Sequence, residues 1–89
     1  MEREDIYNLA LEKYGPTSQL FMVFEEMSEL QKELCKAVRG KANGDHIAEE
    51  IADVKIMLAQ MQILFGNSEK VEEYTSAKLK RLAERLGAE

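Results

Sequence analysis

Apolar side chains recur every three or four positions along most of this chain, which is the period of an amphipathic α-helix. Three short breaks rich in Gly, Asn and Pro divide the chain into four such stretches. No stretch alternates with the period of two that is typical of a β-strand. The predicted fold class is therefore all-α. The predicted helices span about 3–14, 17–39, 45–65 and 69–86.

The residues at or just after two of these breaks are expected to begin the longer helices. The break at 15–17 ends the first helix, and Thr17 or Ser18 can then cap the second with a side-chain oxygen. Asp45 follows the break at 40–44 and can cap the third helix in the same way. Connections this short favour antiparallel neighbours, so we expect a four-helix chain in an antiparallel bundle.

The two longer helices differ in how many of their sides are apolar. Helix 17–39 has one stripe, expected to face the core, made of Leu20, Val23, Phe24, Met27, Leu30, Leu34, Ala37 and Val38. Helix 45–65 has a main stripe made of Ile47, Ile51, Val54, Leu58, Met61 and Phe65, and an opposite one made of Ala52, Ile56, Ala59 and Ile63. A helix with two apolar sides is buried on two sides. We expect helix 45–65 to lie between its own bundle and a second subunit, so that homo-oligomerisation completes the bundle.

Length and charge limit the classes of function. The chain has 89 residues, which suits a single domain over 1–89 with a thin core. Its net charge of −5 argues against a nucleic-acid polymer as partner, because phosphate backbones bind basic surfaces. A phosphorylated small molecule stays compatible if divalent cations lie between it and an acidic site. No apolar run is long enough to span a membrane.

The N-terminal residues and the cysteine content indicate a compartment. Residues 1–5 are mostly charged and lack the apolar region of a signal peptide. The single cysteine, Cys35, cannot form a disulfide within the chain. We therefore expect a cytoplasmic protein, since a reducing compartment does not favour disulfides.

Two pairs of carboxylates are candidates for a metal site: Glu26 with Glu29, and Glu50 with Asp53. The spacing of three puts both members of each pair on one helix face, about 5–6 Å apart. If the two helices are neighbours and the pairs face each other, four carboxylates need protons or cations to offset their repulsion. Oxygen ligands without His or Cys suit Mg²⁺, or Mn²⁺. A di-iron bundle would need Glu-x-x-His, which His46 does not provide.

Solvated surface charge is the competing interpretation of these pairs. Of the 89 residues, 17 are acidic, and acidic residues three or four apart are common on exposed helix faces. Glu26 and Glu50 nevertheless border the apolar stripes of their helices, and a partly desolvated carboxylate requires a partner. Spacing and placement alone leave both interpretations open.

The four carboxylates belong to a longer double motif. It reads Glu25-Glu26-Met27-Ser28-Glu29, then twenty residues, then Glu50-Ile51-Ala52-Asp53. This motif, with Gln19-Leu20 upstream, resembles that of the MazG-like all-α nucleotide pyrophosphohydrolases. The resemblance covers roughly residues 18–86 and identifies the chain as a candidate single MazG-like domain.

The resemblance implies an activity and a set of site residues. Proteins of this family convert a nucleoside or deoxynucleoside triphosphate to the monophosphate and pyrophosphate, and they assemble as tight dimers or tetramers. Their metal ligands correspond here to Glu26, Glu29, Glu50 and Asp53, the same four that the spacing selects. Glu25 and Glu49 are candidate catalytic residues that would orient water, although a solvated residue explains each of them equally well.

The last helix is the candidate phosphate-binding element. The family often has Lys-x-x-x-Asn-x-x-Arg there, and Lys78 and Arg85 match this pattern, whereas Leu82 replaces the asparagine. Arg81, one turn away, is expected to compensate. Favourable charge near a helix C-terminus explains the same basic residues, and both roles can hold together. Lys78, Arg81 and Arg85 are thus the candidates for substrate binding.

The predicted function is Mg²⁺-dependent hydrolysis of a nucleoside triphosphate. One alternative is a non-enzymatic helical interaction module that oligomerises and uses its charges only for solubility. Another is an enzyme restricted to dUTP, dCTP or a modified nucleotide. The sequence does not choose a base, because the candidates for a base pocket are equally suited to packing: Gln19, Phe21, Phe24 and Tyr74.

Overall fold

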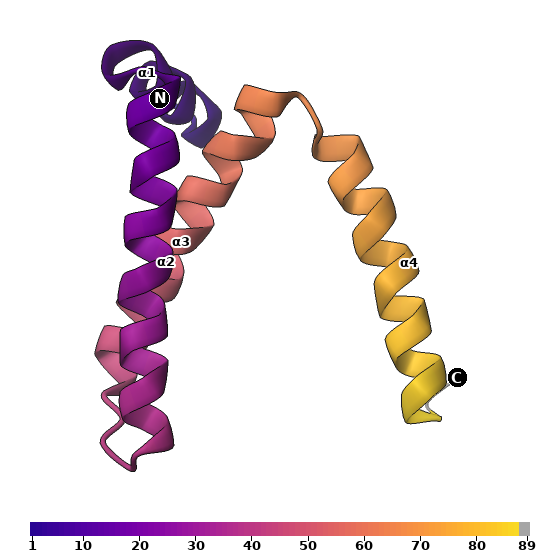
Figure 1. Cartoon of the computed structure of the whole chain (residues 1–89). Coiled ribbons are helices and arrows are strands. Elements are labelled where there is room, and N and C mark those ends of the chain that lie inside the picture. The colour runs from indigo at the N-terminus through magenta and orange to yellow at the C-terminus, as the bar shows by residue number, and fades with distance from the viewer. Residues whose placement is uncertain (88–89) are drawn as a thin grey trace.

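The structure is a computed structural model that describes residues 1–87. Within these residues the chain forms four helices and no strand. The all-α prediction is therefore confirmed, and each predicted helix is present within about two residues of its expected ends. The helices are α1 (Arg3–Tyr14), α2 (Pro16–Val38), α3 (Gly44–Phe65) and α4 (Ser68–Leu86), shown in Figure 1.

The helix starts differ from the predicted caps. Helix α2 begins at Pro16, and no side chain caps it, so the prediction of Thr17 or Ser18 as its cap is wrong. Proline suits the first helical position, because the backbone N–H that it lacks has no helical partner there. The cap of α3 is Asn43, whose side chain accepts a hydrogen bond from the backbone N–H of His46 at 3.2 Å, and not Asp45.

Helices α2 and α3 pack against each other as a hairpin, joined by the short loop after Val38 (Figure 1). The buried apolar side chains of the described chain are Val23 of α2 and Met57 of α3, and neither is fully buried. The other buried residues are polar: Gln19, Glu33 and Gln60. The core is therefore thin, and polar groups occupy much of the contact between the two helices.

The predicted core-facing stripes are only partly buried. On α2, Phe24, Met27, Leu34 and Val38 are exposed, and on α3, Ile51, Leu58 and Phe65 are exposed. The buried face of α3 instead follows Glu50, Val54, Met57 and Gln60. Periodicity finds an apolar stripe, but it does not say which stripe the chain's own helices cover.

Helix α1 contacts both α2 and α3, whereas α4 contacts α3 alone. Figure 1 shows α4 turning away from the hairpin after the end of α3, so that the two helices form a wide V. Gly66 makes this turn with φ +60, and the backbone N–H of Asn67 donates to the Gln62 carbonyl at 3.2 Å. Within residues 1–87, none of the helices has the length and apolar character needed to cross a membrane.

Candidate metal centre

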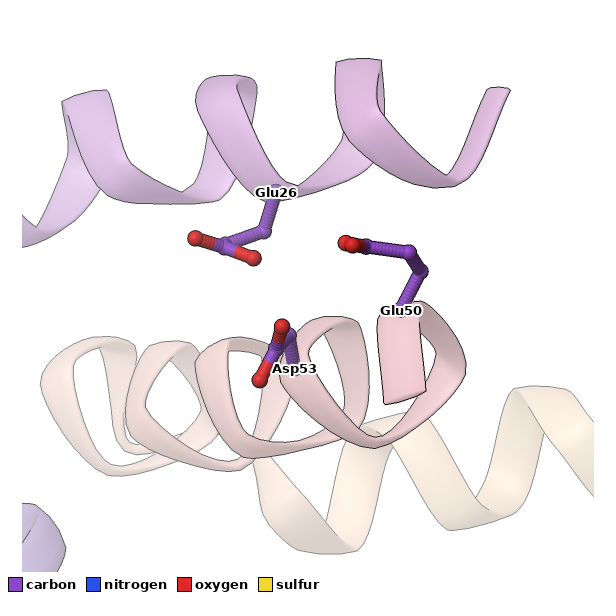
Figure 2. Close-up of side chains that lie close together, drawn as sticks. All are labelled: Glu26, Glu50 and Asp53. Atoms are coloured by element: carbon purple, nitrogen blue, oxygen red, sulfur yellow. The ribbon is translucent and has the colours of Figure 1, made fainter. Parts of the chain in front are cut away.

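Glu26, Glu50 and Asp53 converge between α2 and α3. Each offers one carboxylate oxygen, and the three oxygens all lie within 4.8 Å of one another. Figure 2 shows the Glu26 side chain extending from α2 toward Glu50 and Asp53, which extend from α3. All three residues are half-buried. Three of the four carboxylates predicted as ligands are thus brought together in one small volume.

Local geometry explains this arrangement. Glu50 and Asp53 lie three apart on α3, so both face the same direction. Glu26 lies midway along α2 on the side that also carries the buried residues Gln19 and Val23, seven and three positions earlier. The hairpin places these two faces against each other, so the carboxylates meet at the helix–helix contact rather than on an outer surface.

The environment of the cluster disfavours the ionised carboxylates. Burial raises the pKa of Glu26, and the neighbouring charge of Asp53, together with a hydrogen bond between these two side chains, raises it further. Burial likewise raises the pKa of Glu50, with further contributions from the charges of Asp53 and Glu29. Both shifts have the causes expected of carboxylates that share a confined space without a neutralising group.

The described residues provide no counter-charge for the cluster. The basic groups that form ion pairs pair with other acids: Lys36 with Glu33 and Lys70 with Glu73, and His46 pairs with Glu33 only when its ring is protonated. The Oε2 atom of Glu50 is buried and has no hydrogen-bond partner. Because an ionised carboxylate accepts hydrogen bonds but donates none, a bound cation would satisfy this oxygen where the protein does not. A donor set made of carboxylate oxygens alone fits a hard cation such as Mg²⁺ or Mn²⁺.

The other predicted acidic residues lie around the cluster rather than in it. Glu29 is exposed on α2 and is absent from the group of three, although its charge is close enough to raise the pKa of Glu50. Glu25 and Glu49 are also exposed. The charge of Glu25 contributes to the raised pKa of Glu26, and the charge of Glu49 to that of Glu50. These three side chains are neighbours of the cluster that remain open to solvent.

The predicted phosphate-binding residues are on α4, which contacts α3 but not α2. Lys78, Arg81 and Arg85 are all exposed. Lys78 and Arg81 line a shallow hollow of about 430 Å³ together with Tyr74. The single chain therefore gathers two of the three basic residues with one aromatic side chain, but it does not join them to the carboxylate cluster.

Two buried polar residues near the site were not predicted. Glu33 is buried; its Oε2 pairs with Lys36 at 3.1 Å, its Oε1 lacks a hydrogen bond, and its charge contributes to the raised pKa of Glu50. Gln60 is buried with an unpaired Oε1. Glu33 lies seven residues after Glu26 and Gln60 seven after Asp53, so each shares a helix face with a cluster residue. That spacing of seven is the signal that could have identified both.

Comparison with protein-family models, with curated proteins and with solved structures gave no match to this chain.

Proposed function

We propose that this chain is a Mg²⁺-dependent nucleoside or deoxynucleoside triphosphate pyrophosphohydrolase of the MazG-like type, which releases the monophosphate and pyrophosphate. One observation supports this proposal above the others. It is the convergence of Glu26, Glu50 and Asp53 within 4.8 Å, without any basic partner among the described residues. The order of the double motif along the sequence supports the same proposal.

The carboxylates would hold the cation, with Glu29 joining from its exposed position. Glu26, Glu50 and Asp53 supply hard oxygen donors at a spacing that suits a divalent ion. When bound, the ion neutralises phosphate charge and lowers the pKa of water, which is the chemistry that phosphoryl transfer requires. Mn²⁺ is expected to replace Mg²⁺, because it takes the same ligands.

The remaining site residues act on water and on the substrate. Glu25 and Glu49 lie on the solvent side of the cluster, where each can accept a hydrogen bond from a water molecule and orient it. Lys78, Arg81 and Arg85 would bind the terminal phosphates. The guanidinium groups of the two arginines match phosphate oxygens in pairs, and the ammonium group of Lys78 is a compact positive charge. A triphosphate is repelled by the bare acidic cluster, so these residues can act on it only with the cation present.

The experiment that tests this function measures pyrophosphate release from a panel of nucleoside triphosphates with Mg²⁺. The panel includes dUTP and dCTP, so that a narrow substrate range is detected as well as a broad one. Replacing Glu50→Gln should remove turnover while the helical circular dichroism persists, whereas Glu12→Gln, an exposed residue of α1, should leave turnover unchanged. Turnover that survives Glu50→Gln, or no turnover of any substrate by the wild type, would contradict the proposal.

The proposal extends to assembly and location. It describes an antiparallel bundle that is completed by homo-oligomerisation, as a dimer or a tetramer, in the cytoplasm. The exposed apolar residues on α2, α3 and α4 support assembly, and they support equally a second candidate function, that of a non-enzymatic oligomeric interaction module. The nucleotide panel separates the two, because an interaction module releases no pyrophosphate.

A further inference from the structure

Helix α4 has an apolar stripe that nothing in its own chain covers. Val71, Leu79, Leu82 and Leu86 lie on one side of the helix at spacings of three, four and eight, and all four are exposed. Full burial of a side chain of this size is worth about 1.5–3 kcal/mol, and each of these partly exposed side chains forgoes part of that stabilisation. A long amphipathic helix that contacts only the end of its neighbour is therefore an element that requires a partner surface.

A groove elsewhere on the same chain has the matching apolar character. It lies between α1 and α3 and has a volume of about 830 Å³. Its apolar lining includes Ile6 and, from the outer side of α3, Ile51, Ile56 and Leu58. These four residues are themselves exposed in the single chain. The groove spans both apolar sides of α3, because Ile51 and Leu58 belong to the main stripe and Ile56 to the second stripe, for which the sequence predicted contact with another subunit.

The surface area indicates how much of the chain should be covered. The accessible surface is 7051 Å², whereas a compact monomer of this mass exposes about 5,300 Å². The radius of gyration, 15.9 Å, likewise exceeds the roughly 12 Å of a compact domain of this length. The excess of about 1,700 Å² on each of two chains is within the range that obligate homodimers bury.

Charge also favours a second copy as the occupant. The C-terminal half of α4 is basic, with Lys78, Lys80, Arg81 and Arg85 against Glu84 alone. The chain as a whole has a net charge of −5, so the remaining helices are acidic. A copy of α4 is therefore attracted to an acidic body, which accelerates encounter, whereas the charged residues that line the groove itself, Arg3 and Lys55, are basic, so charge favours association but does not set the orientation.

We propose that α4 of one copy lies in the α1–α3 groove of a second copy, and that the reverse contact forms at the same time. This reciprocal exchange covers the stripe of α4 and the outer side of α3 in both chains. It is a closed twofold arrangement, because each chain gives the same helix and receives the same helix. The inference rests on the homo-oligomer of the proposed function and assigns the surfaces that form it; it does not depend on the hydrolase activity.

Cross-linking tests this contact directly. Cys35, which is exposed and free, is first replaced by Ser so that only introduced thiols react. Chains with Ile56→Cys and tagged chains with Leu82→Cys are mixed, equilibrated and treated with a short bis-maleimide. We expect a covalent product that contains one tagged and one untagged chain. The matched control exchanges Leu82→Cys for Lys80→Cys, on the polar side of α4, and should give much less of that product.

Sedimentation equilibrium supplies the second measurement. The unmodified chain should sediment at twice its 10.2 kDa or at a multiple of that dimer, and Leu82→Glu should shift the mass toward that of a single chain. A wild-type chain that is folded and monomeric overturns both the homo-oligomer and this contact. An oligomer in which Cys at position 56 of one chain does not cross-link to Cys at position 82 of another overturns the exchange and leaves the homo-oligomer intact. The same conclusion follows if a chain that carries both substitutions cross-links only within itself. Leu82→Glu and Leu82→Cys report independently, so loss of folding in the first does not affect the cross-link.

Discussion

Glu26 on α2 and Asp53 on α3 present carboxylate oxygens within 4.8 Å of each other at the centre of the α2–α3 contact. This approach is one of the causes that raise the pKa of Glu26. When both carboxylates are ionised, they repel each other across the α2–α3 contact that holds the hairpin together. The contact is therefore weakest when both groups are ionised, and it is strengthened by any cation that binds between them.

Divalent cations should stabilise the folded chain. At a free Mg²⁺ concentration about 100 times the Kd, binding adds about 2.7 kcal/mol to the free energy of unfolding. Thermal melts followed by circular dichroism, with Mg²⁺ or Mn²⁺ against EDTA, measure the effect. Asp53→Asn should remove the response and Glu12→Gln should retain it. An equal response in the wild type and in Asp53→Asn would show that the cation binds elsewhere.

Stability without divalent cations should fall as the pH rises. The folded-state pKa of Glu50 is raised above the ordinary value of 4.5, so the folded chain holds this proton more tightly than the unfolded chain. The corresponding stabilisation is complete below about pH 4.5 and is lost as the pH passes upward through the raised pKa. The same sign holds for Glu26, whose pKa is also raised.

Urea denaturation between about pH 4.5 and 8 in EDTA checks this dependence. The informative quantity is the difference between the wild type and Glu50→Gln, because carboxylates outside the cluster then cancel. The wild type should lose stability relative to Glu50→Gln as the pH rises, and saturating Mg²⁺ should suppress that loss. A constant difference across the range would mean that Glu50 titrates as it does in the unfolded chain.

Met57→Ala should be severely destabilising. Met57 is one of two buried apolar residues in the described chain, and removing a buried side chain of this size costs about 2–5 kcal/mol. Domains have only about 5–15 kcal/mol of total stability, so this single change brings the chain close to unfolding. Met57→Leu, which conserves volume, should cost less than about 1.5 kcal/mol. The midpoint of chemical denaturation compares the two, and equal midpoints would show that Met57 is not a core residue.

Gly66→Ala should destabilise the end of α3 by about 1 kcal/mol. The φ of Gly66 is +60, a conformation that residues with a Cβ rarely adopt, and no neighbouring atom lies where that Cβ would be. The penalty is therefore one of backbone conformation alone, and Gly66→Asn should cost less, because asparagine tolerates this region. Gly44→Ala is the matched control, since Gly44 has equal space and no positive φ. A loss in Gly44→Ala as large as that in Gly66→Ala would contradict this explanation.

The sequence was sufficient for the helices and for most of the carboxylate cluster. Breaks at glycine, asparagine and proline determine where helices end, and these are local effects that a sequence records. The spacing of three between Glu50 and Asp53 is local in the same sense, so their common direction could be predicted. Glu26 was selected by its spacing of three from Glu29, its place at the border of its stripe supported that choice, and its carboxylate lies at the contact with α3.

The choice of buried face could not be predicted in the same way. Phe24 and Ile51 are as apolar as Val23 and Met57, and yet they are exposed in the single chain. Which side of a helix is covered depends on how many helices one chain supplies and how they cross, which are properties of the whole assembly. The prediction of the α3 cap was wrong for a related reason. Asn43 and Asp45 are both good capping residues, and the loop conformation selects between them.

The scarcity of buried side chains, with Val23 and Met57 as the only buried apolar residues among residues 1–87, has a consequence for the life of the protein. In the proposed homo-oligomer the apolar surface would be covered mainly by another copy, so the chain would gain stability with concentration, because association consumes the folded monomer. Dilute, newly made chains are then the ones exposed to proteases, and abundant chains protect one another. The amount synthesised would thereby set the fraction that survives, which makes the level of this protein self-reinforcing above a threshold.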